Sequence, residues 1–197
     1  MFRGIFLDRD GTINEEVEYI TSPDEVKLIP GAAEAIHRAN VSGFKVIVIT
    51  NQSAIARGLL TEEKLKTIHQ RLSELLEGDG AHVDGIYYCP HHPDIGEPPY
   101  RTICDCRKPL PGMLRKAARD HDIDLSQSYV VGDRSIDLET GNAIGAYTIL
   151  VRTGYGNHEA DSILKNGGKT DFIAADLLEA VDHILIHASH VEHRHPY

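Results

Sequence analysis

The sequence contains few cysteines, few basic residues and no long hydrophobic run. Three cysteines are an odd number, which argues against a closed disulfide framework. Only 20 lysines and arginines stand against 30 acidic residues, a formal net charge of −10, so the chain lacks the positive excess typical of a general nucleic-acid binder. An acidic protein can still be positive at one site, so an anionic substrate is compatible with this balance.

The apolar stretches are too short for a membrane span. The run at 46–49 is one of the longest, whereas a transmembrane helix needs about 20 apolar residues. The amino-terminal stretch becomes acidic at Asp8, before the apolar core of a signal peptide could form. We therefore expect a cytoplasmic protein with neither a membrane nor a nucleic acid as its partner. No feature demands a second subunit, and we expect a monomer.

The 197 residues correspond to one domain, since domains contain about 150 residues. A domain of this size buries roughly 70% of the surface of its unfolded chain and needs no disulfides for stability. We predict a single domain over 1–187 and a flexible tail over 188–197. Histidines gather near the end of the chain, at His183, His187, His190, His193 and His195. His183 and His187 share a helix face and could bind a metal weakly, but we favour a frayed polar terminus.

Hydrophobic patterns predict alternating strands and helices. Short apolar or β-branched runs predict strands over 4–7, 45–50, 83–88, 128–131 and 147–151. Helical spacing with capping residues predicts helices over 31–42, 61–77, 111–121, 138–144 and 176–187. This alternation predicts a doubly wound, Rossmann-like α/β fold with a mostly parallel sheet and helices on both faces. In such sheets, ligands bind beyond the carboxyl ends of the strands.

Polar residues follow three of the predicted strands. Asp8 and Asp10 follow the first strand, Thr50 follows the second, and Asp133 follows the fourth. Asp137 and Lys108 are expected at the same edge. Four carboxylates in one cleft repel one another, and a Mg²⁺ ion, which prefers oxygen ligands, would relieve that repulsion. Each aspartate alone could be a helix cap on the surface, but the ordered set argues for a magnesium site.

Four segments of the chain resemble the motifs of the haloacid dehalogenase-like phosphohydrolases. They are FLDRDGT, ITN, RKP and VGDRSID, in that order. The resemblance implies that Asp8 is a nucleophile forming an aspartyl-phosphate, and that Asp10 is the general acid and base, for which we expect a raised pKa. It also implies that Thr50 and Lys108 hold the phosphoryl group. For Mg²⁺ it implies the ligands Asp8, Asp10 through its carbonyl, and Asp133, with Asp137 in an outer position.

The aspartate at position 10 also bears on the type of enzyme. Pump ATPases of this family lack that acid, so its presence favours a phosphatase or a phosphomutase. Mutases usually carry a helical cap domain after the first or second motif. The stretches 13–50 and 53–107 leave no room for a folded cap. We therefore expect the domain over 1–187 to be a phosphatase core with an open site.

The three cysteines lie in a proline-rich loop over 89–106. Cys89, Cys104 and Cys106, with one histidine, would complete a tetrahedral Cys₃His zinc site, and a site without an open position would be structural. Either His91 or His92 could be the fourth ligand, and the resemblance described next indicates His91. The alternative is a loop with three reduced cysteines.

The zinc loop narrows the resemblance to one branch of the family. LIPGAAEAI, TNQSAIARG, DGIYYCPHHP, CDCRKPLPGM and LVRTGYG resemble the branch that contains D-glycero-D-manno-heptose 1,7-bisphosphate phosphatase and histidinol-phosphate phosphatase. The resemblance implies removal of the 7-phosphate of a heptose bisphosphate, on the route to nucleotide-activated heptose. Arg107 and Arg57 are candidates to grip a second phosphate, and Asn51 and Gln52 to bind sugar hydroxyls. Solvation of the surface is the alternative role for these four side chains.

Two other functions compete with this interpretation. Histidinol-phosphate phosphatase would use the same chemistry, but its cationic substrate would favour an acidic pocket rather than the arginines present here. A zinc-containing binding module without catalysis is disfavoured by the intact set of motif residues. The segment Asp94–Ile103 lengthens the cysteine loop beyond the compact pattern, and its effect on the choice of anomer or substrate stays open.

Overall fold

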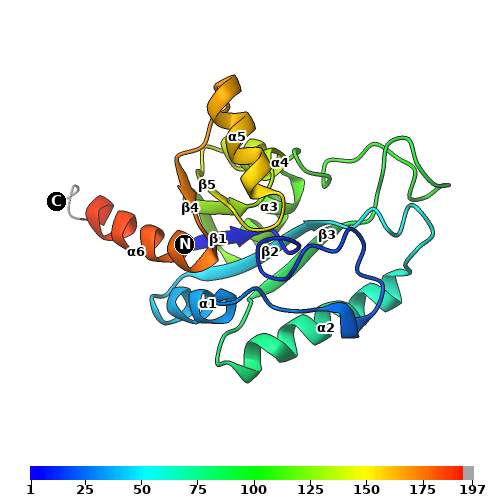
Figure 1. Ribbon diagram of the computed structural model, residues 1–197, viewed down its shortest axis with the longest axis horizontal. Coiled ribbons are helices and arrows are strands. Elements are labelled where there is room, and N and C mark those ends of the chain that lie inside the picture. Colours follow the sequence, from blue (N-terminus) through cyan, green and yellow to red (C-terminus); the bar gives the residue numbers. More distant parts are fainter. Residues whose placement is uncertain (193–197) are drawn as a thin grey trace.

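A six-stranded parallel sheet forms the centre of the molecule, in the order β3-β2-β1-β4-β5-β6 (Figure 1). The computed structural model describes residues 1–192. The strands are β1 (Phe2–Leu7), β2 (Lys45–Asn51), β3 (Gly85–Cys89), β4 (Ile123–Gly132), β5 (Tyr147–Val151) and β6 (Phe172–Ala174). All five pairings between neighbours are parallel, which confirms the predicted doubly wound α/β fold.

Alternation of side chains along the strands builds a core on each face of the sheet. In β1, Ile5 and Leu7 belong to one core and Phe6 belongs to the other. The run at 46–49 in β2 alternates in the same way, and all four residues are fully buried. A strand covered on both faces is continuously apolar, as the sequence pattern indicated.

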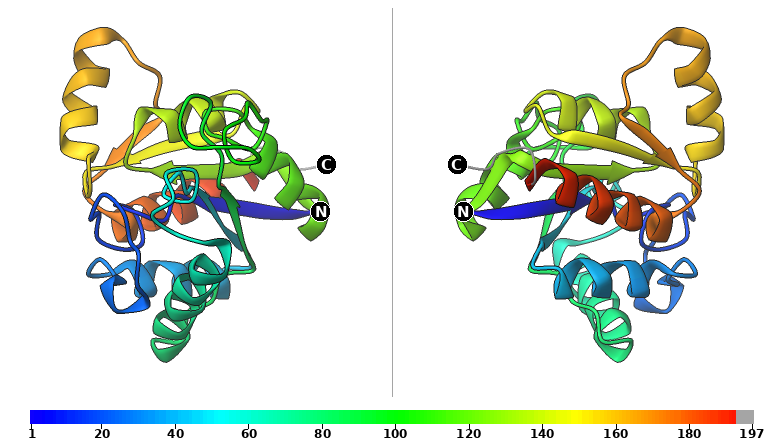
Figure 2. Two further views of the ribbon diagram at one scale, coloured as in Figure 1. Left: turned by 90° about the vertical axis from the view of Figure 1, so that its right-hand side faces the viewer. Right: turned by 90° about the vertical axis from the view of Figure 1, so that its left-hand side faces the viewer.

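Three helices cover each face of the sheet (Figure 2). On one face lie α1 (Ala32–Val41), α2 (Glu62–Gly78) and α6 (Leu177–Glu192). On the other face lie α3 (Gly112–His121), α4 (Ser135–Asn142) and α5 (Gly156–Asn166). The cap of α2 follows the sequence expectation, since the Thr61 hydroxyl accepts a hydrogen bond of 3.2 Å from the backbone N–H of Lys64.

The strand order reverses between β1 and β4. From β1 the chain proceeds to β2 on one side, whereas from β4 it proceeds to β5 on the other. The loops that leave the carboxyl ends of β1 and β4 therefore diverge and leave a crevice between them, where ligands bind in doubly wound folds. The backbone N–H of Asp8 donates to the carbonyl of Val131 at 2.9 Å, which holds these two strand ends side by side.

The segments between the motifs are as small as the sequence predicted. Between β1 and β2 the chain forms a 3₁₀ turn, η1 (Pro23–Glu25), and α1, and between β2 and β3 it forms α2. Within residues 1–192 there is thus no inserted cap domain, and the crevice has no domain above it. No helix in the same range is both long enough and apolar enough to cross a membrane.

Three features at the carboxyl-terminal end differ from the expectation. Helix α5 and strand β6 were not predicted. Strand β6 has only three residues, two of them half-buried, so its apolar pattern is too short to recognise. Helix α6 continues to Glu192 instead of ending near His187, so residues 188–192 are helical. Ala188 is buried against the core, which explains the extra turn. His193 and His195 lie outside the described residues.

Candidate active site

Lys108 lies between two buried carboxylates at the carboxyl end of the sheet. Its Nζ is 2.7 Å from Asp8 Oδ1, 2.6 Å from Asp137 Oδ1 and 3.0 Å from the carbonyl oxygen of Ile49. The lysine is 3% exposed and Asp137 is 1% exposed. Burial opposes the charge of Lys108, but Asp137 and Asp8 raise its pKa above the ordinary value, so the lysine stays cationic.

Asp8 directly follows β1 at the edge of the crevice. Burial, together with the charges of Asp137 and Asp10, raises the pKa of this carboxyl to about 7, although the charge of Lys108 acts to lower it. A single lysine thus does not fully compensate the acidic groups around Asp8. A second cation at the site would favour the ionised carboxylate.

Asp133 follows β4 and is completely buried. Its Oδ2 accepts a hydrogen bond of 2.8 Å from the backbone N–H of Tyr155, while Oδ1 has no partner. Burial raises the pKa of Asp133 to about 8, and the nearby Asp8 and Asp137 act in the same direction. Gly11, with a φ of +77°, allows this approach, because a Cβ atom there would overlap Asp133 Oδ2. One oxygen of each of Asp8, Asp133 and Asp137 lies within 4.8 Å of the others, and we call these residues the carboxylate cluster.

The pKa of Asp10 is lowered, whereas those of Asp8 and Asp133 are raised, so the rise that we expected for Asp10 is wrong. Burial opposes ionisation, but the Arg9 guanidinium and hydrogen bonds from Asn14 and Gln52 hold the pKa of Asp10 below its ordinary value. Arg9 donates to both oxygens of Asp10, through Nε at 3.0 Å and Nη2 at 2.9 Å. Our expectation counted the acidic neighbours and overlooked the arginine that stands between the two aspartates in the sequence.

The three residues after β2 make different contacts. Thr50 is buried, and its hydroxyl accepts a hydrogen bond of 2.8 Å from Gln52 Nε2. Asn51 binds the backbone of Lys108 in both directions, since its Nδ2 donates to the carbonyl at 3.2 Å and its Oδ1 accepts from the N–H at 3.0 Å. Asn51 thus fixes the segment that carries the lysine. Gln52 contacts Thr50 and Asp10 rather than standing free for a sugar.

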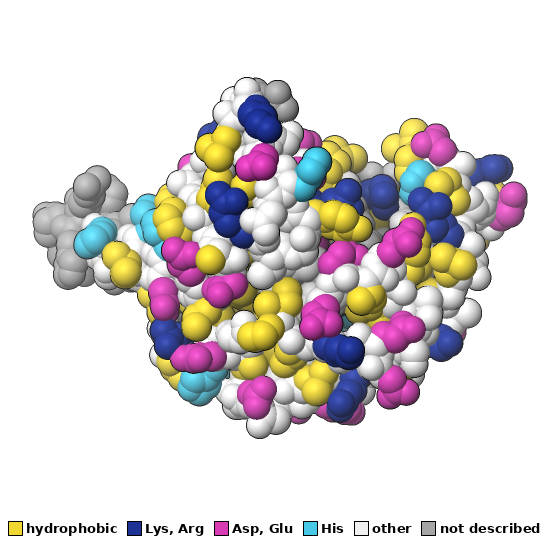
Figure 3. Space-filling model, in the orientation of Figure 1, with side chains coloured by type: hydrophobic (Ala, Val, Ile, Leu, Met, Phe, Trp, Pro, Cys, Tyr) yellow, Lys and Arg dark blue, Asp and Glu magenta, His cyan; other side chains and the backbone are white. Residues whose placement is uncertain are grey.

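These residues line a pocket of about 290 Å³. Arg107 and Arg134 also line it, and within residues 1–192 neither guanidinium forms an ion pair with a carboxylate. Arg57 does not line the pocket but lies over the ring of Tyr19, 5.6 Å from its centroid, and Tyr19 is part of the wall. Over the face shown in Figure 3, acidic and basic side chains are interspersed.

Several residues of the pocket wall were not identified from the sequence. They are Arg9, Glu16, Glu18, Tyr19, Arg134 and Tyr155. Arg9 and Arg134 stand inside the quoted motifs, so their position beside a motif aspartate could have identified them. The guanidinium of Arg134 lies 4.9 Å from the ring centroid of Tyr155. Tyr155 stands in LVRTGYG, a stretch quoted for the resemblance, but no role was assigned to it there. Glu16, Glu18 and Tyr19 lie in the irregular segment after β1, where no pattern indicated a side-chain direction.

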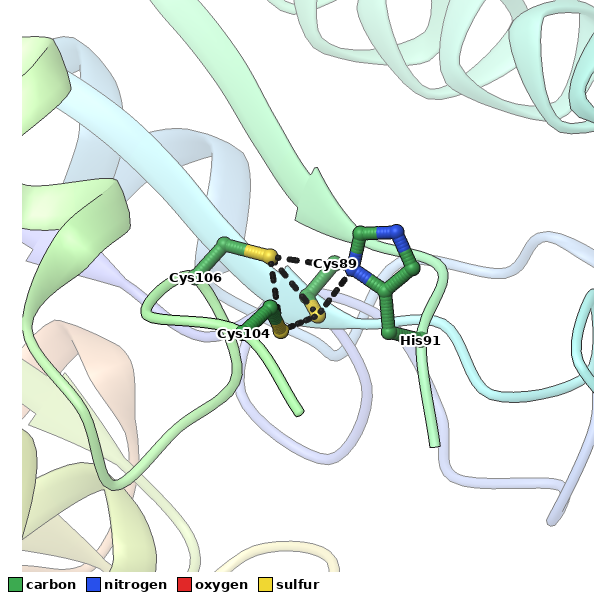
Figure 4. Close-up of side chains that lie close together, drawn as sticks. All are labelled: Cys89, His91, Cys104 and Cys106. Carbon is green, nitrogen blue, oxygen red and sulfur yellow. Dashed lines mark hydrogen bonds between the residues drawn. The ribbon is translucent and has the colours of Figure 1, made fainter. Parts of the chain in front are cut away.

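The cysteine loop brings four metal-binding side chains together (Figure 4). Cys106 Sγ lies 3.0 Å from Cys89 Sγ, 3.2 Å from Cys104 Sγ and 3.4 Å from His91 Nδ1. All four ligand atoms lie within 4.8 Å of one another, and none of the three cysteines forms a disulfide. We call these four residues the cysteine cluster. Three thiols and one imidazole nitrogen at such distances form a donor set that suits a tetrahedral metal.

The structure also distinguishes the two neighbouring histidines. His91 points into the cysteine cluster, whereas His92 Nδ1 accepts hydrogen bonds from the backbone N–H groups of Asp94 and Ile95, at 3.1 and 3.2 Å. Arg107 Nη1 donates to the carbonyl oxygen of His91 at 3.0 Å. The cysteine cluster is therefore tied to the wall of the pocket through Arg107, next to Lys108.

Comparison with known proteins places the chain in a family. Residues 105–180 match the family model described as HAD-hydrolase-like. A D-glycero-D-manno-heptose-1,7-bisphosphate 7-phosphatase from Thermosynechococcus vestitus is 40% identical over 190 residues, which are 93% of this chain and 95% of the relative. The D-glycero-beta-D-manno-heptose-1,7-bisphosphate 7-phosphatase of Escherichia coli strain K12 is 44% identical over 151 residues, 76% of this chain and 79% of the relative.

A solved structure shows the same fold. The D,D-heptose 1,7-bisphosphate phosphatase from B. bronchiseptica, in a complex with magnesium and phosphate, is 38% identical and superposes with a TM-score of 0.82 over 94% of this chain and 99% of that chain. The family resemblance inferred from the motifs is confirmed. The chain belongs to the HAD-like phosphatases, within the family of the D-glycero-D-manno-heptose-1,7-bisphosphate 7-phosphatases.

Proposed function

We propose that this protein is a Mg²⁺-dependent phosphomonoesterase that removes the 7-phosphate of D-glycero-D-manno-heptose 1,7-bisphosphate through an aspartyl-phosphate. The observation that carries the proposal is the buried contact of Lys108 with Asp8 and Asp137 at the carboxyl ends of the strands. A buried lysine holds one oxygen of Asp8, orients the carboxylate and adds positive charge where a phosphoryl group would arrive. The relatives that carry this enzyme name share 40 to 44% of their residues with the chain.

The reaction needs two displacements at phosphorus. In the first, an oxygen of Asp8 forms a bond to phosphorus, the bond from phosphorus to the sugar oxygen breaks, and Asp10, in its protonated form, supplies a proton to that oxygen. In the second, water attacks phosphorus, Asp10 takes its proton, and the bond to Asp8 breaks to release phosphate. Thr50 and Lys108 hold the phosphoryl oxygens in both steps.

The carboxylate cluster fits a Mg²⁺ ion. Asp133 Oδ1 is buried without a partner, and burial among acidic groups raises the pKa of Asp8 and Asp133, which is the environment that a divalent cation would relieve. Asp8, Asp133 and the carbonyl of Asp10 would hold the ion, with Asp137 in an outer position. When bound, Mg²⁺ stabilises negative charge on the transferred phosphoryl group.

The cysteine cluster fits a structural Zn²⁺ ion. Its four donors lie within 4.8 Å of one another and would complete a tetrahedral site with no open position for water. The loop carries few buried apolar side chains besides Cys89, so a metal would supply the order that a hydrophobic core supplies elsewhere. Because Arg107 and Lys108 directly follow Cys106, the same ion would also fix two residues of the pocket.

The arginines of the pocket support a bisphosphate over histidinol phosphate. Arg107 and Arg134 carry no carboxylate partner in the described part of the chain and are free to bind a second phosphate. A cationic amino alcohol would instead meet like charge there. A cytoplasmic location and a monomeric state stay predictions.

The test is release of phosphate from heptose 1,7-bisphosphate, other sugar bisphosphates and histidinol phosphate, with and without Mg²⁺. We expect the heptose bisphosphate to have the highest kcat/KM, with ³¹P NMR showing heptose 1-phosphate as the product. Asp8→Asn should lose at least about 10³-fold in kcat because it removes the nucleophile. The matched control is Asp120→Asn, an exposed residue on α3 that pairs with Lys116. Preference for histidinol phosphate, or full turnover by Asp8→Asn, would contradict the proposal.

A further inference from the structure

Arg9 is one of the most deeply buried side chains of the protein, although it carries a permanent charge. It is 1% exposed and stands between the proposed nucleophile Asp8 and the proposed general acid Asp10. Its Nε and Nη2 contact the two oxygens of Asp10 at 3.0 and 2.9 Å, a two-point contact that fixes the plane of the carboxylate.

The carboxylate of Asp10 is surrounded by donors. Besides Arg9, Asn14 Nδ2 donates to Oδ1 at 2.9 Å and Gln52 Nε2 donates to Oδ2 at 3.0 Å. Asp10 must release one contact to exchange a proton with a substrate. The two neutral amides form weaker hydrogen bonds than the guanidinium does. They are the contacts that can exchange, whereas the two bonds from Arg9 persist.

A purely structural role does not account for Arg9. Burying a guanidinium is costly, and an apolar side chain of similar size often replaces a buried ion pair without loss of stability. One nitrogen, Nη1, has no hydrogen-bond partner among residues 1–192. The nearby His69 adds no second positive charge, since burial lowers its pKa to about 3 and keeps it neutral. Within residues 1–192, the salt bridge of Arg9 is to Asp10.

We propose that Arg9 is a positioning residue for catalysis: it holds the Asp10 carboxylate in the plane from which Asp10 exchanges protons with the leaving oxygen. This inference rests on the acid and base role of Asp10 in the proposed function. Lysine at position 9 would keep the charge but lose the two parallel N–H groups, so the carboxylate could rotate. Displacement of a catalytic group by about 1 Å can cost about 10²-fold in rate.

The rates of the first turnover on two phosphate esters distinguish a positioning role of Arg9 from other roles. A sugar phosphate has a poor leaving group that needs a proton from Asp10, whereas 4-nitrophenyl phosphate releases a stable anion that does not. We expect Arg9→Lys to slow first-turnover release of heptose 1-phosphate by about 10- to 100-fold, and release of 4-nitrophenolate by less than about threefold. KM for the bisphosphate should change by less than about twofold. The ratio of the two rates is independent of the fraction of folded enzyme.

Three further variants complete the experiment. Asp10→Asn should show the same contrast between esters, and adding Arg9→Lys to it should cost less than about twofold more, because both changes act through one group. Arg38 is an exposed arginine that pairs with Glu34 and Asp182, and the Arg38→Lys control should match the wild type in both first-turnover rates. Equal loss on both esters, or a raised KM, in Arg9→Lys would overturn the inference. Absence of the contrast in Asp10→Asn itself would instead overturn the proposed role of Asp10.

Discussion

The carboxylate cluster and the cysteine cluster are held by different means, although both adjoin Lys108. The aspartates of the carboxylate cluster follow β1 and β4 or begin α4, and they are buried by the packed sheet. In the cysteine cluster, Cys89 ends β3, while the other three residues lie on a loop with no helix or strand of its own. The first cluster also has an internal cation, Lys108, whereas the second consists of neutral or acidic donors.

The difference predicts which cluster needs its metal for structure. The carboxylate cluster keeps its geometry through the sheet and through the lysine, so its metal serves the chemistry. In the cysteine cluster, burial raises the pKa of the Cys89 thiol to about 11, and a bound cation would favour the thiolate there. Loss of the metal from the carboxylate cluster should therefore reduce activity more than local order. Loss of the metal from the cysteine cluster should reduce local order more than activity.

Replacing Lys108 tests the carboxylate cluster and should have the largest effect. Lys108→Met keeps the length of the side chain but leaves Asp8 and Asp137 without their cation, so we expect kcat to fall by about 10³-fold or more. Unfolding should become easier at neutral pH, by on the order of 3 kcal/mol, since two buried carboxylates lose their partner. Phosphate release and denaturant unfolding measure the two quantities.

A lysine outside the site provides the matched control for this prediction. Lys45 pairs with Asp84 at 2.7 Å near the amino end of β2, and Lys45→Met should keep full turnover. If Lys108→Met retained kcat within tenfold of the wild type, the lysine would not belong to the catalytic centre.

Removing the ligands of the cysteine cluster should have an intermediate effect. Cys106→Ser or His91→Ala should abolish stoichiometric zinc and lower kcat/KM by about tenfold, because Arg107 and Lys108 follow the loop. The sheet should persist, with an unchanged far-UV circular dichroism spectrum. His92→Ala is the control, since His92 caps the backbone of its own loop and should retain the metal. A fully active protein without zinc would contradict the link between loop and pocket.

The sequence predicted those parts of the site that depend on strand ends. The continuous apolar run of β2 and the short run of β1 define where strands stop, and parallel topology then brings Asp8, Thr50 and Asp133 to one edge. The sequence did not predict contacts that depend on the direction in which an individual side chain points. Whether His91 or His92 faces the cysteines depends on the local turn, and the low pKa of Asp10 depends on Arg9 folding back onto its neighbour.

In the secondary structure, too, long apolar patterns in the sequence were recognised and short ones were not. Five strands with clear apolar runs were predicted, whereas β6 pairs through three residues at the sheet edge and has too short a pattern to identify. The last helix extends past His187 because that ring packs 4.4 Å from the ring of Tyr147, between centroids. The histidines at 183 and 187 therefore anchor a helix to the sheet, a role that the polar composition of the terminus concealed.

The titration of His69, a buried histidine on α2, should have the smallest effect of the changes proposed here. Its folded-state pKa is about 3 against 6.5 in the unfolded chain, so its contribution to stability is complete above pH 6.5 and is lost as the pH falls toward 3. Between pH 7 and pH 5 the wild type should lose on the order of 1 to 2 kcal/mol more unfolding free energy than His69→Gln. Equal slopes in the wild type and His69→Gln would mean that folding does not shift the pKa of His69 and would contradict its neutral state at pH 5. Its ring would then gain a positive charge beside Arg9 as the pH falls below 6.5.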